Sequence, residues 1–166
     1  MIAFVGLFVM SCDNRDDAII EDNDTYSRVI DYNNVNLVKS STSNSIYGFV
    51  GNLPSYFLAS DALLIYQQIG TSNGNPIWKL LPNTEFVPQG EILYYFDYTV
   101  NDFQITANAD FDLFIQNANF KNTYLNNQRF RVLLIPASFK NANIDYKDYN
   151  SVIKHFNIDD SKVTNL

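Results

Sequence analysis

The sequence contains one cysteine and one histidine, and this scarcity excludes most arrangements of residues that support catalysis or bind metal. His155 alone cannot build a zinc site, and no serine stands in a context that resembles a catalytic triad. We interpret His155 as a residue at the surface or at a helix end. Cys12 adjoins a leader-like segment, which removes it from consideration as a catalytic thiol.

Positive charge is also scarce, because 11 Lys and Arg residues stand against 18 Asp and Glu residues and the net charge is −7. No basic run of five residues occurs. Such a chain repels nucleic-acid phosphates and anionic lipid headgroups. We expect no nucleic-acid partner and no cofactor, and we interpret the acidic charge as a source of solubility.

The acidic residues do not form a recognisable site either. Four aspartates lie near one another in the sequence and could supply oxygen ligands for calcium: Asp97, Asp102, Asp110 and Asp112. Their spacing does not match a calcium-binding loop, and polar strand faces and turns explain them equally well. A glycosidase needs two carboxylates across a cleft, which the sequence alone does not reveal. The sequence therefore predicts no catalytic residue and no metal ligand.

No apolar run is long enough to span a membrane. Residues Ile2 to Met10 form an uncharged apolar segment about half the length of the roughly 20 residues that a spanning helix needs. This length is typical of the core of a secretory signal peptide. Ser11 and Cys12 follow, and the chain then turns abruptly polar.

The segment Val9-Met10-Ser11-Cys12 resembles the lipobox of bacterial lipoproteins, in which the cysteine is lipidated and becomes the first residue of the mature protein. Two alternatives are a thiol that stays reactive or pairs between chains, and a buried N-terminal strand. The abrupt change at Cys12 favours lipidation. No basic residue precedes Cys12, so we expect the true start of the signal peptide to lie upstream.

These features divide the chain into three parts. Residues 1–11 are the expected signal peptide, residues 12–25 the lipidated cysteine and an acidic tether, and residues 26–166 a single domain. In Bacteroidota-type lipoproteins, acidic residues after the cysteine resemble a surface-export signal, and Asp16 and Asp17 fit that pattern. We expect an outer-membrane lipoprotein of the cell envelope, exposed at the surface and held to the membrane by its acyl chains.

The folded part reads as mostly β, because Phe and Tyr are abundant, Gly and Pro are few, and short apolar runs alternate with turn-rich gaps. We expect an antiparallel β-sandwich, either Ig-like or jelly-roll-like. Its predicted strands cover residues 29–38 (one strand or a pair, interrupted at Asn33-Asn34), 45–50, 62–69, 76–81, 91–99, 101–110 and 129–135.

Three local features refine this prediction. Asn73-Gly74 indicates that residues 62–69 and 76–81 form a hairpin, with a loop longer than the two-residue ideal. Residues 110–128 are ambiguous between a short helix and a loop. Asp145 is a candidate cap for one short amphipathic C-terminal helix, expected on a sheet edge or at an open end of the sandwich.

Aromatic residues are the remaining candidates for a site. Tyr66, Trp78 and Tyr95 could form a sugar-binding face, although for Trp78 a place in the core is the favoured interpretation. Arg129 and Arg131 share one strand face and could pair with Asp97 or Glu91. A structural ion pair is the default interpretation of these arginines.

Several motifs recur in the same order in a known group of proteins. They are Leu63-Leu64-Ile65-Tyr66, Trp78-Lys79-Leu80-Leu81-Pro82, Tyr94-Tyr95-Phe96-Asp97-Tyr98-Thr99 and the run from Asn127 to Ala137, followed by the helix around Tyr149-Asn150. In these motifs the stretch from Asp61 to about Ile158 resembles a family of uncharacterised small lipoproteins of Bacteroidota, chiefly flavobacteria. The motifs are framework strands, so the resemblance implies a fold rather than an activity.

Members of that family often carry a collagen-like spacer after the cysteine, whereas this chain has an acidic one. Some are labelled collagen-like or dihydrolipoamide dehydrogenase. Neither label fits this chain, which has no Gly-X-Y repeat, no G-x-G-x-x-G motif and no redox cysteine pair.

The sequence thus predicts a lipid-anchored, non-enzymatic envelope protein that binds another protein or scaffolds surface machinery. The alternative is a glycan-binding β-sandwich module, which requires a row of exposed aromatic residues on one sheet face. A third hypothesis, a hydrolase, requires a pocket with two converging carboxylates.

Overall fold

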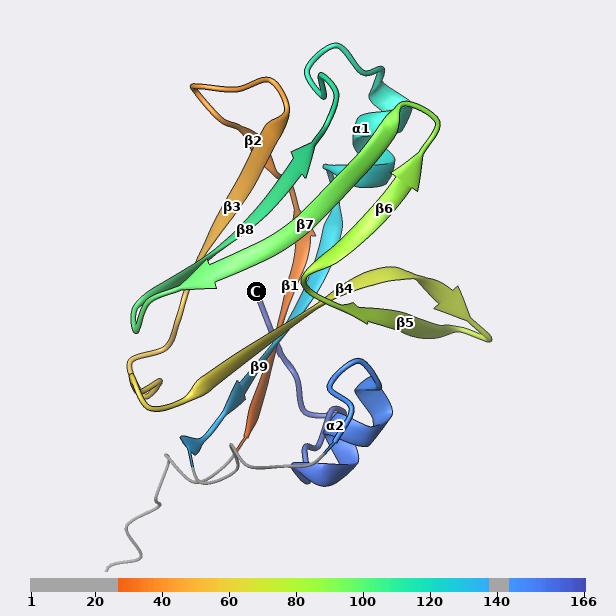
Figure 1. Cartoon of the computed structure of the whole chain (residues 1–166). Helices are drawn as coiled ribbons and strands as arrows, with labels where there is room; N and C mark the ends of the chain where they lie inside the picture. Colours follow the sequence, from red (N-terminus) through yellow and green to blue (C-terminus); the bar gives the residue numbers. More distant parts are fainter. Residues whose placement is uncertain (1–26, 138–143) are drawn as a thin grey trace, which may run out of the picture.

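The computed structural model describes residues 27–137 and 144–166. The predictions for the leader, for Cys12 and for Asp16 and Asp17 lie outside these residues. The described part is a sandwich of two five-stranded sheets, which confirms the predicted fold class (Figure 1).

The first sheet has the strand order β10-β1-β9-β4-β5. Its strands are β1 (Arg28–Val35), β4 (Ala62–Ser72), β5 (Asn75–Leu80), β9 (Gln128–Ile135) and β10 (Thr164–Asn165). All neighbours are antiparallel except β1 and β10, which are parallel. Residues 129–135, predicted as a strand, do form one, and it lies at the centre of this sheet.

The second sheet has the order β2-β3-β8-β7-β6 and is antiparallel throughout. Its strands are β2 (Val38–Lys39), β3 (Ile46–Asn52), β6 (Asn83–Val87), β7 (Gly90–Tyr98) and β8 (Asp102–Ala109). The segment predicted at residues 29–38 is therefore divided between the two sheets, with an irregularity between Tyr32 and Val35 where Asn34 has a φ of 54°. The predictions contained neither β6 nor β10.

The main core lies between the sheets. On β8, Phe103, Ile105, Ala107 and Ala109 are buried in this core, and Thr106 on the opposite face is also only 3% exposed. Ile65, Phe130 and Val132 reach the same core from the first sheet. A Cβ atom on Gly51 would lie 2.3 Å from the Phe103 ring, so the glycine on β3 makes room for that ring.

The C-terminal segment packs on the outer face of the first sheet. Helix α2 (Tyr149–His155) and the residues after it bury Val152, Phe156 and Ile158 against strand residues such as Tyr66 and Leu133 (Figure 1). Helix α2 contacts the edge strand β5, as the prediction of a sheet edge allows, and the segment also covers the outer face of β1, β4 and β9, whose apolar side chains lie on both faces of the sheet. The predicted cap was wrong: Asp148 caps α2, and Asp145 instead accepts a hydrogen bond from the backbone of Lys147.

The β4–β5 hairpin turns more tightly than predicted. Ser72 pairs with Asn75, so Asn73 and Gly74 form a two-residue turn. Their φ values of 51° and 81° match the turn type that Asn-Gly favours. Helix α1 (Ala118–Tyr124) occupies the ambiguous region and packs at one end of the sandwich.

Candidate functional site

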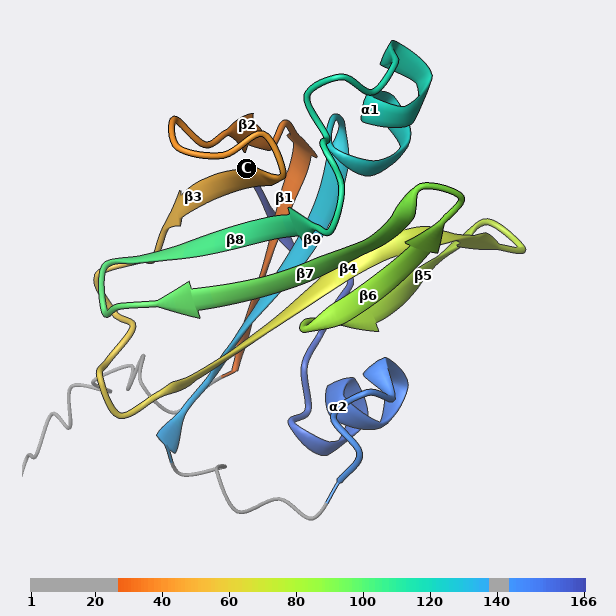
Figure 2. The same ribbon diagram turned by 45° about the horizontal axis from the view of Figure 1, so that its top comes forward.

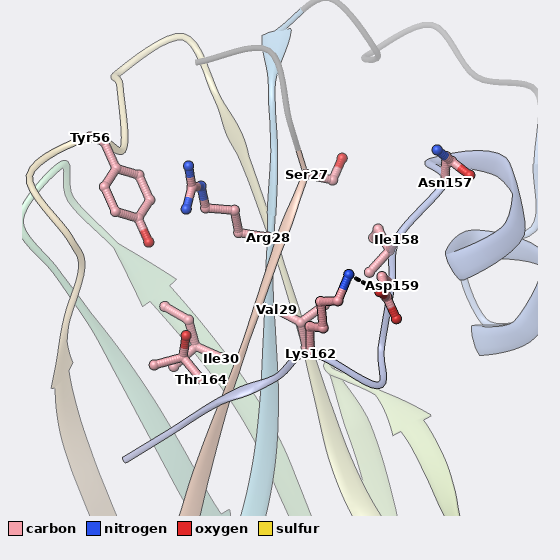
Figure 3. Close-up of a pocket in the computed structure, with 10 residues that line it drawn as sticks. All are labelled: Ser27, Arg28, Val29, Ile30, Tyr56, Asn157, Ile158, Asp159, Lys162 and Thr164. Atoms are coloured by element: carbon pink, nitrogen blue, oxygen red, sulfur yellow. Dashed lines mark ion pairs between the residues drawn. The ribbon is translucent and has the colours of Figure 1, made fainter. Parts of the chain in front are cut away.

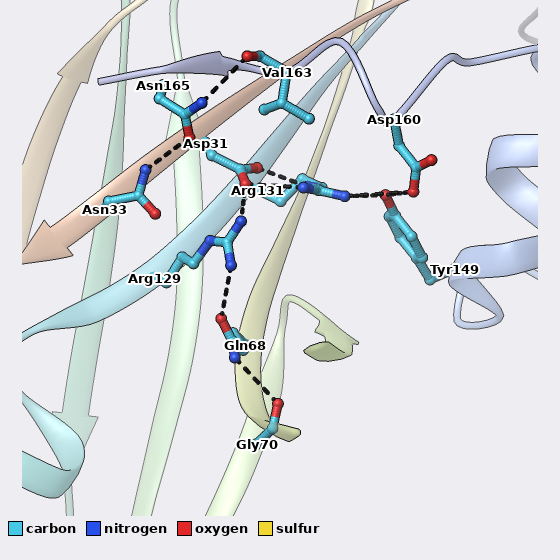
Figure 4. Close-up of polar contacts among 10 residues, drawn as sticks. All are labelled: Asp31, Asn33, Gln68, Gly70, Arg129, Arg131, Tyr149, Asp160, Val163 and Asn165. Carbon is cyan, nitrogen blue, oxygen red and sulfur yellow. Dashed lines mark hydrogen bonds and ion pairs between the residues drawn. The ribbon is translucent and has the colours of Figure 1, made fainter. Parts of the chain in front are cut away.

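A buried ion cluster holds the outer face of the first sheet together (Figure 4). Asp31 on β1 is 0% exposed and lies directly across from Arg131 on β9. Arg131 donates from Nε to Oδ1 at 2.6 Å and from Nη2 to Oδ2 at 2.8 Å. Arg129 adds a bond from Nη2 to Oδ2 at 2.5 Å. One carboxylate therefore neutralises part of the charge of two guanidinium groups.

The cluster continues into the C-terminal segment. Arg131 donates from Nη1 to the Tyr149 hydroxyl, which in turn donates to Asp160 at 3.1 Å. Burial opposes the charge of Arg131, but its hydrogen bonds to Asp31 and Tyr149 outweigh burial and raise its pKa. Burial also raises the pKa of Tyr149 to about 12, against the lowering effect of Arg131. The cluster thereby fastens α2 to the sheet.

The predicted partners of these arginines, Asp97 and Glu91, were wrong. Both lie on β7 in the other sheet. Reasoning from sequence missed Asp31, which is 100 residues away from Arg131 in the chain. The available signal was Asp31 itself, a charged residue flanked by the apolar Val29, Ile30 and Tyr32, because a carboxylate buried among them needs a partner of opposite charge.

The structure does not bring the three candidate aromatics onto one exposed face. Tyr66 is 0% exposed, and its hydroxyl donates to the carbonyl of Tyr146 at 2.7 Å. Trp78 is half-buried on the same side of the same sheet, with the guanidinium carbon of Arg131 4.5 Å and that of Arg129 5.2 Å from its ring. Tyr95 is half-buried on the outer face of the other sheet.

We describe three cavities lined by described residues. The first has a volume of about 450 Å³ and is lined by residues 78–84 and Lys147. A second, of about 250 Å³, lies at the start of β1, where Arg28 stacks over Tyr56 at 4.7 Å and Lys162 pairs with Asp159 at 3.0 Å (Figure 3). The third, of about 110 Å³, lies between the sheets and includes Glu85. None of these three cavities is lined by two carboxylates, the feature that a hydrolase would need.

The third cavity adjoins a chain of buried amides. Gln128 donates to the carbonyls of Thr123 and Asn126, which leaves its oxygen to accept from Gln67 at 3.2 Å. Asn83 then donates to Gln67 at 3.3 Å. The sequence contained little signal for this network, because its members come from three strands that are far apart in the chain.

No described helix lies over the outer face of the second sheet (Figure 2), and apolar side chains on that face are exposed. We call this surface the open face. Its exposed apolar residues are Val38 (71% exposed), Val50 (60%), Phe86 (80%) and Leu93 (39%). Across its middle, Gly48 pairs with Thr106 and Thr106 pairs with Tyr95. The open face therefore has a small polar centre between two apolar sides.

Three of the four acidic candidates stabilise turns, and the fourth, Asp97, is exposed on β7. Asp102 accepts from the Thr99 hydroxyl, and Asp110 accepts from the backbone of Glu91. Asp112 accepts from Asn44 and two backbone N–H groups, and these bonds lower its pKa despite the opposing effect of desolvation. Within residues 27–137 and 144–166, no three His, Cys, Asp or Glu side chains are grouped so as to hold a metal ion. His155 is the exposed last residue of α2.

Comparison of the chain with protein-family models, with curated proteins and with solved structures finds no match in any of the three. The resemblance to small Bacteroidota lipoproteins therefore stays a prediction. Among the helices of the described ranges, none has the length and apolar character needed to cross a membrane.

Proposed function

We propose that this protein is a lipid-anchored, non-enzymatic binding module of the bacterial cell envelope and that its open face docks another protein. The observation that carries the proposal is the difference between the two sheets. The chain's own C-terminal segment covers the outer face of the first sheet, whereas no described helix lies over the outer face of the second.

The composition of the open face suits a protein partner. Phe86 and Leu93 stand on one side of the face, and Val38 and Val50 stand on the other. Large apolar side chains that are grouped and exposed mark interaction surfaces more often than single exposed residues do.

The first experiment tests the open face. Native protein is crosslinked in intact cells and purified from detergent-solubilised envelopes, and its partner is identified by mass spectrometry. The double variant Val50→Asp/Phe86→Asp should lose this partner, because both charges would be buried at the interface. Ile115→Asp is the matched control, since Ile115 is 73% exposed and lies outside the open face. Retention of the same partner by the double variant would contradict the proposal.

The second experiment tests the anchor. Cys12→Ala removes the sulfur atom that would carry the acyl chains, and each buried methylene contributes about 0.8 kcal/mol to membrane binding. We expect the variant to lose incorporated fatty acid and to leave the membrane fraction. A variant that stays in the membrane fraction would refute lipidation at Cys12.

Glycan binding is the second candidate, and one group of residues on the open face favours it. Tyr95 lies across from Thr106, whose neighbours on the same face of β8 are Gln104 and Asn108. An aromatic ring beside amide groups can stack on the apolar face of a sugar and hydrogen-bond its hydroxyls. On a glycan array, Tyr95→Ala should abolish any signal that the native chain gives, while Ile115→Asp should retain it.

A further inference from the structure

The strands of the two sheets carry charges of opposite sign. Those of the first sheet contain four basic residues and one acidic residue: Arg28, Lys79, Arg129, Arg131 and Asp31. Those of the second sheet contain four acidic residues and one basic residue: Glu85, Glu91, Asp97, Asp102 and Lys39. Glu85 faces inward and pairs with Lys79 at 2.8 Å, so the other three acidic residues determine the charge on the outer side of this sheet.

Four carboxylates stand at the two ends of the open face. At one end, Glu91 lies beside Asp110, whose backbone N–H donates to the carbonyl of Glu91 at 3.3 Å. At the other end, Asp97 pairs with Gln104, and Asp102 is the next outward residue on the same strand as Gln104. The odd-numbered residues of β7 face outward, so Glu91 and Asp97 lie on one face. Along a strand these two residues are about 20 Å apart.

No described basic residue forms an ion pair with these four carboxylates. Asp102 accepts a hydrogen bond from the Thr99 hydroxyl, and Asp110 accepts one from the backbone N–H of Glu91. These bonds fix the positions of the two carboxylates without removing their charge. Lys39, on β2, donates from its amine to the carbonyl of the next residue at 2.9 Å. The open face therefore has uncompensated negative charge at both ends.

The middle of the open face has the width of a helix. Strand β8 runs between β3, which carries Val50, and β7, which carries Leu93 (Figure 2). Two strand spacings separate β3 from β7, about 10 Å, and a helix with its side chains is about 10–12 Å wide. Thr106, in the middle of β8, is 3% exposed, Gly48 beside it has no side chain, and Gln104 lies along the strand because its amide donates to the Thr106 hydroxyl at 3.2 Å. A helix of about 13 residues along β8 would span the 20 Å between the acidic ends.

We propose that the open face binds a basic amphipathic helix of the partner protein. This inference rests on the proposed function, the docking of a protein on this face, and adds the chemistry of the partner. The apolar side of the helix packs between Val50 and Leu93, and Lys or Arg side chains near its two ends reach the carboxylates. Apolar surfaces recognise amphipathic helices through anchors three or four residues apart. Complementary charge sets the orientation and rejects acidic helices.

Three synthetic peptides of about 18 residues, long enough to span both acidic ends, test the proposal on the folded chain. Two are amphipathic helices that share a Leu face and carry either Lys or Glu near both ends, and the third is a scrambled Lys peptide without an apolar face. Calorimetry gives the affinity, and the backbone amide resonances of Tyr95 and Thr106 report the site. We expect the Lys helix to shift both resonances and to bind at least about tenfold more tightly than the other two peptides.

Two double variants provide the matched comparison. Glu91→Gln/Asp97→Asn should weaken binding of the Lys helix by about twofold to thirtyfold, as expected for the loss of two exposed ion pairs. Asp145→Asn/Asp159→Asn removes two exposed carboxylates from the C-terminal segment and should leave the affinity unchanged. Equal affinities of the Lys and Glu helices, undiminished binding of the scrambled peptide, equal effects of the two double variants, or no binding of any peptide would each overturn the proposal.

Crosslinking in intact cells separates this inference from the proposed function. We expect Val50→Asp/Phe86→Asp and Glu91→Gln/Asp97→Asn both to lose the partner, and Asp145→Asn/Asp159→Asn to retain it. Loss of the partner from the first variant only would leave the open face as the docking surface but refute a basic partner. Retention of the partner by both open-face variants would refute the docking surface itself.

Discussion

Replacement of Asp31 by asparagine should cost more stability than any other single exchange of a carboxylate for an amide in the described domain. The amide keeps the shape of the side chain but removes the negative charge that faces Arg129 and Arg131. Arg131 is only 5% exposed, so its charge would remain buried without the carboxylate that it contacts most closely. Removing one partner of a buried ion pair costs about 3–5 kcal/mol.

The structure favours the lower end of that range. Asp160 lies 3.6 Å from Arg131 and would partly compensate for the lost charge, and the side chain of Arg129 is 34% exposed to solvent. We therefore expect Asp31→Asn to lower the free energy of unfolding by about 3 kcal/mol. For a domain of this size, that loss corresponds to a decrease in Tm of about 6–12 °C.

Urea unfolding provides the measurement, followed by far-ultraviolet circular dichroism and by the fluorescence of Trp78. Asp97→Asn is the control, because Asp97 is exposed on β7, and its effect should stay within about 0.5 kcal/mol. In a double-mutant cycle, Asp31→Asn and Arg131→Met together should destabilise the domain by less than the sum of their separate effects. A loss below about 1 kcal/mol for Asp31→Asn, or strict additivity in the cycle, would refute this account of the cluster.

Three further predictions concern the packing of the core, the loss of stability at low pH and the loss of stability at high pH. Gly51→Ala should destabilise the domain by about 1–3 kcal/mol, because the new methyl group overlaps the Phe103 ring, and thermal unfolding should show partial rescue when Phe103→Leu is added. Hydrogen bonds from the Ser151 side chain and from backbone N–H groups lower the pKa of Asp148 in the folded state. The stability that its carboxylate contributes is therefore complete above the ordinary pKa of 3.8 and is lost as the pH falls through the lower pKa of the folded state. The difference in unfolding midpoint between the native chain and Asp148→Asn should therefore shrink between about pH 5 and about pH 2, and a constant difference would contradict this role. Burial raises the pKa of Tyr66, Tyr94 and Tyr149 above the ordinary 10.0. The stability that these tyrosines contribute is therefore complete below pH 10.0 and declines as the pH rises toward their pKa values in the folded state. A spectrophotometric titration at about pH 11 should count fewer phenolates in the native protein than in urea, and equal counts would contradict the burial of these tyrosines.

Local patterns predicted those strands whose two faces differ or whose neighbours are close in sequence. On β8 the residues that face the core are apolar and Gln104 and Asn108 on the other face are exposed, and Asn73-Gly74 identifies the β4–β5 hairpin. Strand β6 was missed because it inverts the usual pattern. Its inward residues include Asn83 and Glu85, while Phe86 points outward and is 80% exposed.

Long-range pairings were not predictable in the same way. Charges on one strand face show that a partner is needed, but they do not say which strand supplies it, so Arg129 and Arg131 were assigned to Asp97 or Glu91 instead of Asp31. Tyr66 and Tyr95 both lie within predicted strands, yet Tyr66 is buried beneath the C-terminal segment and Tyr95 lies on the open face. Their environments follow from sheet order, which the local sequence does not encode.

The position of β1 has a consequence for how the chain reaches this structure. Its two neighbours, β9 and β10, both come from the last 39 residues of the sequence, and Leu166 exchanges hydrogen bonds with Asp31 and Asn33. The first sheet therefore cannot assemble around β1 until residues 128–166 are available. Contacts of such large sequence separation slow folding, because long loops must close before any pairing stabilises them. Until those residues have been synthesised, β1 has neither of the two strands that flank it.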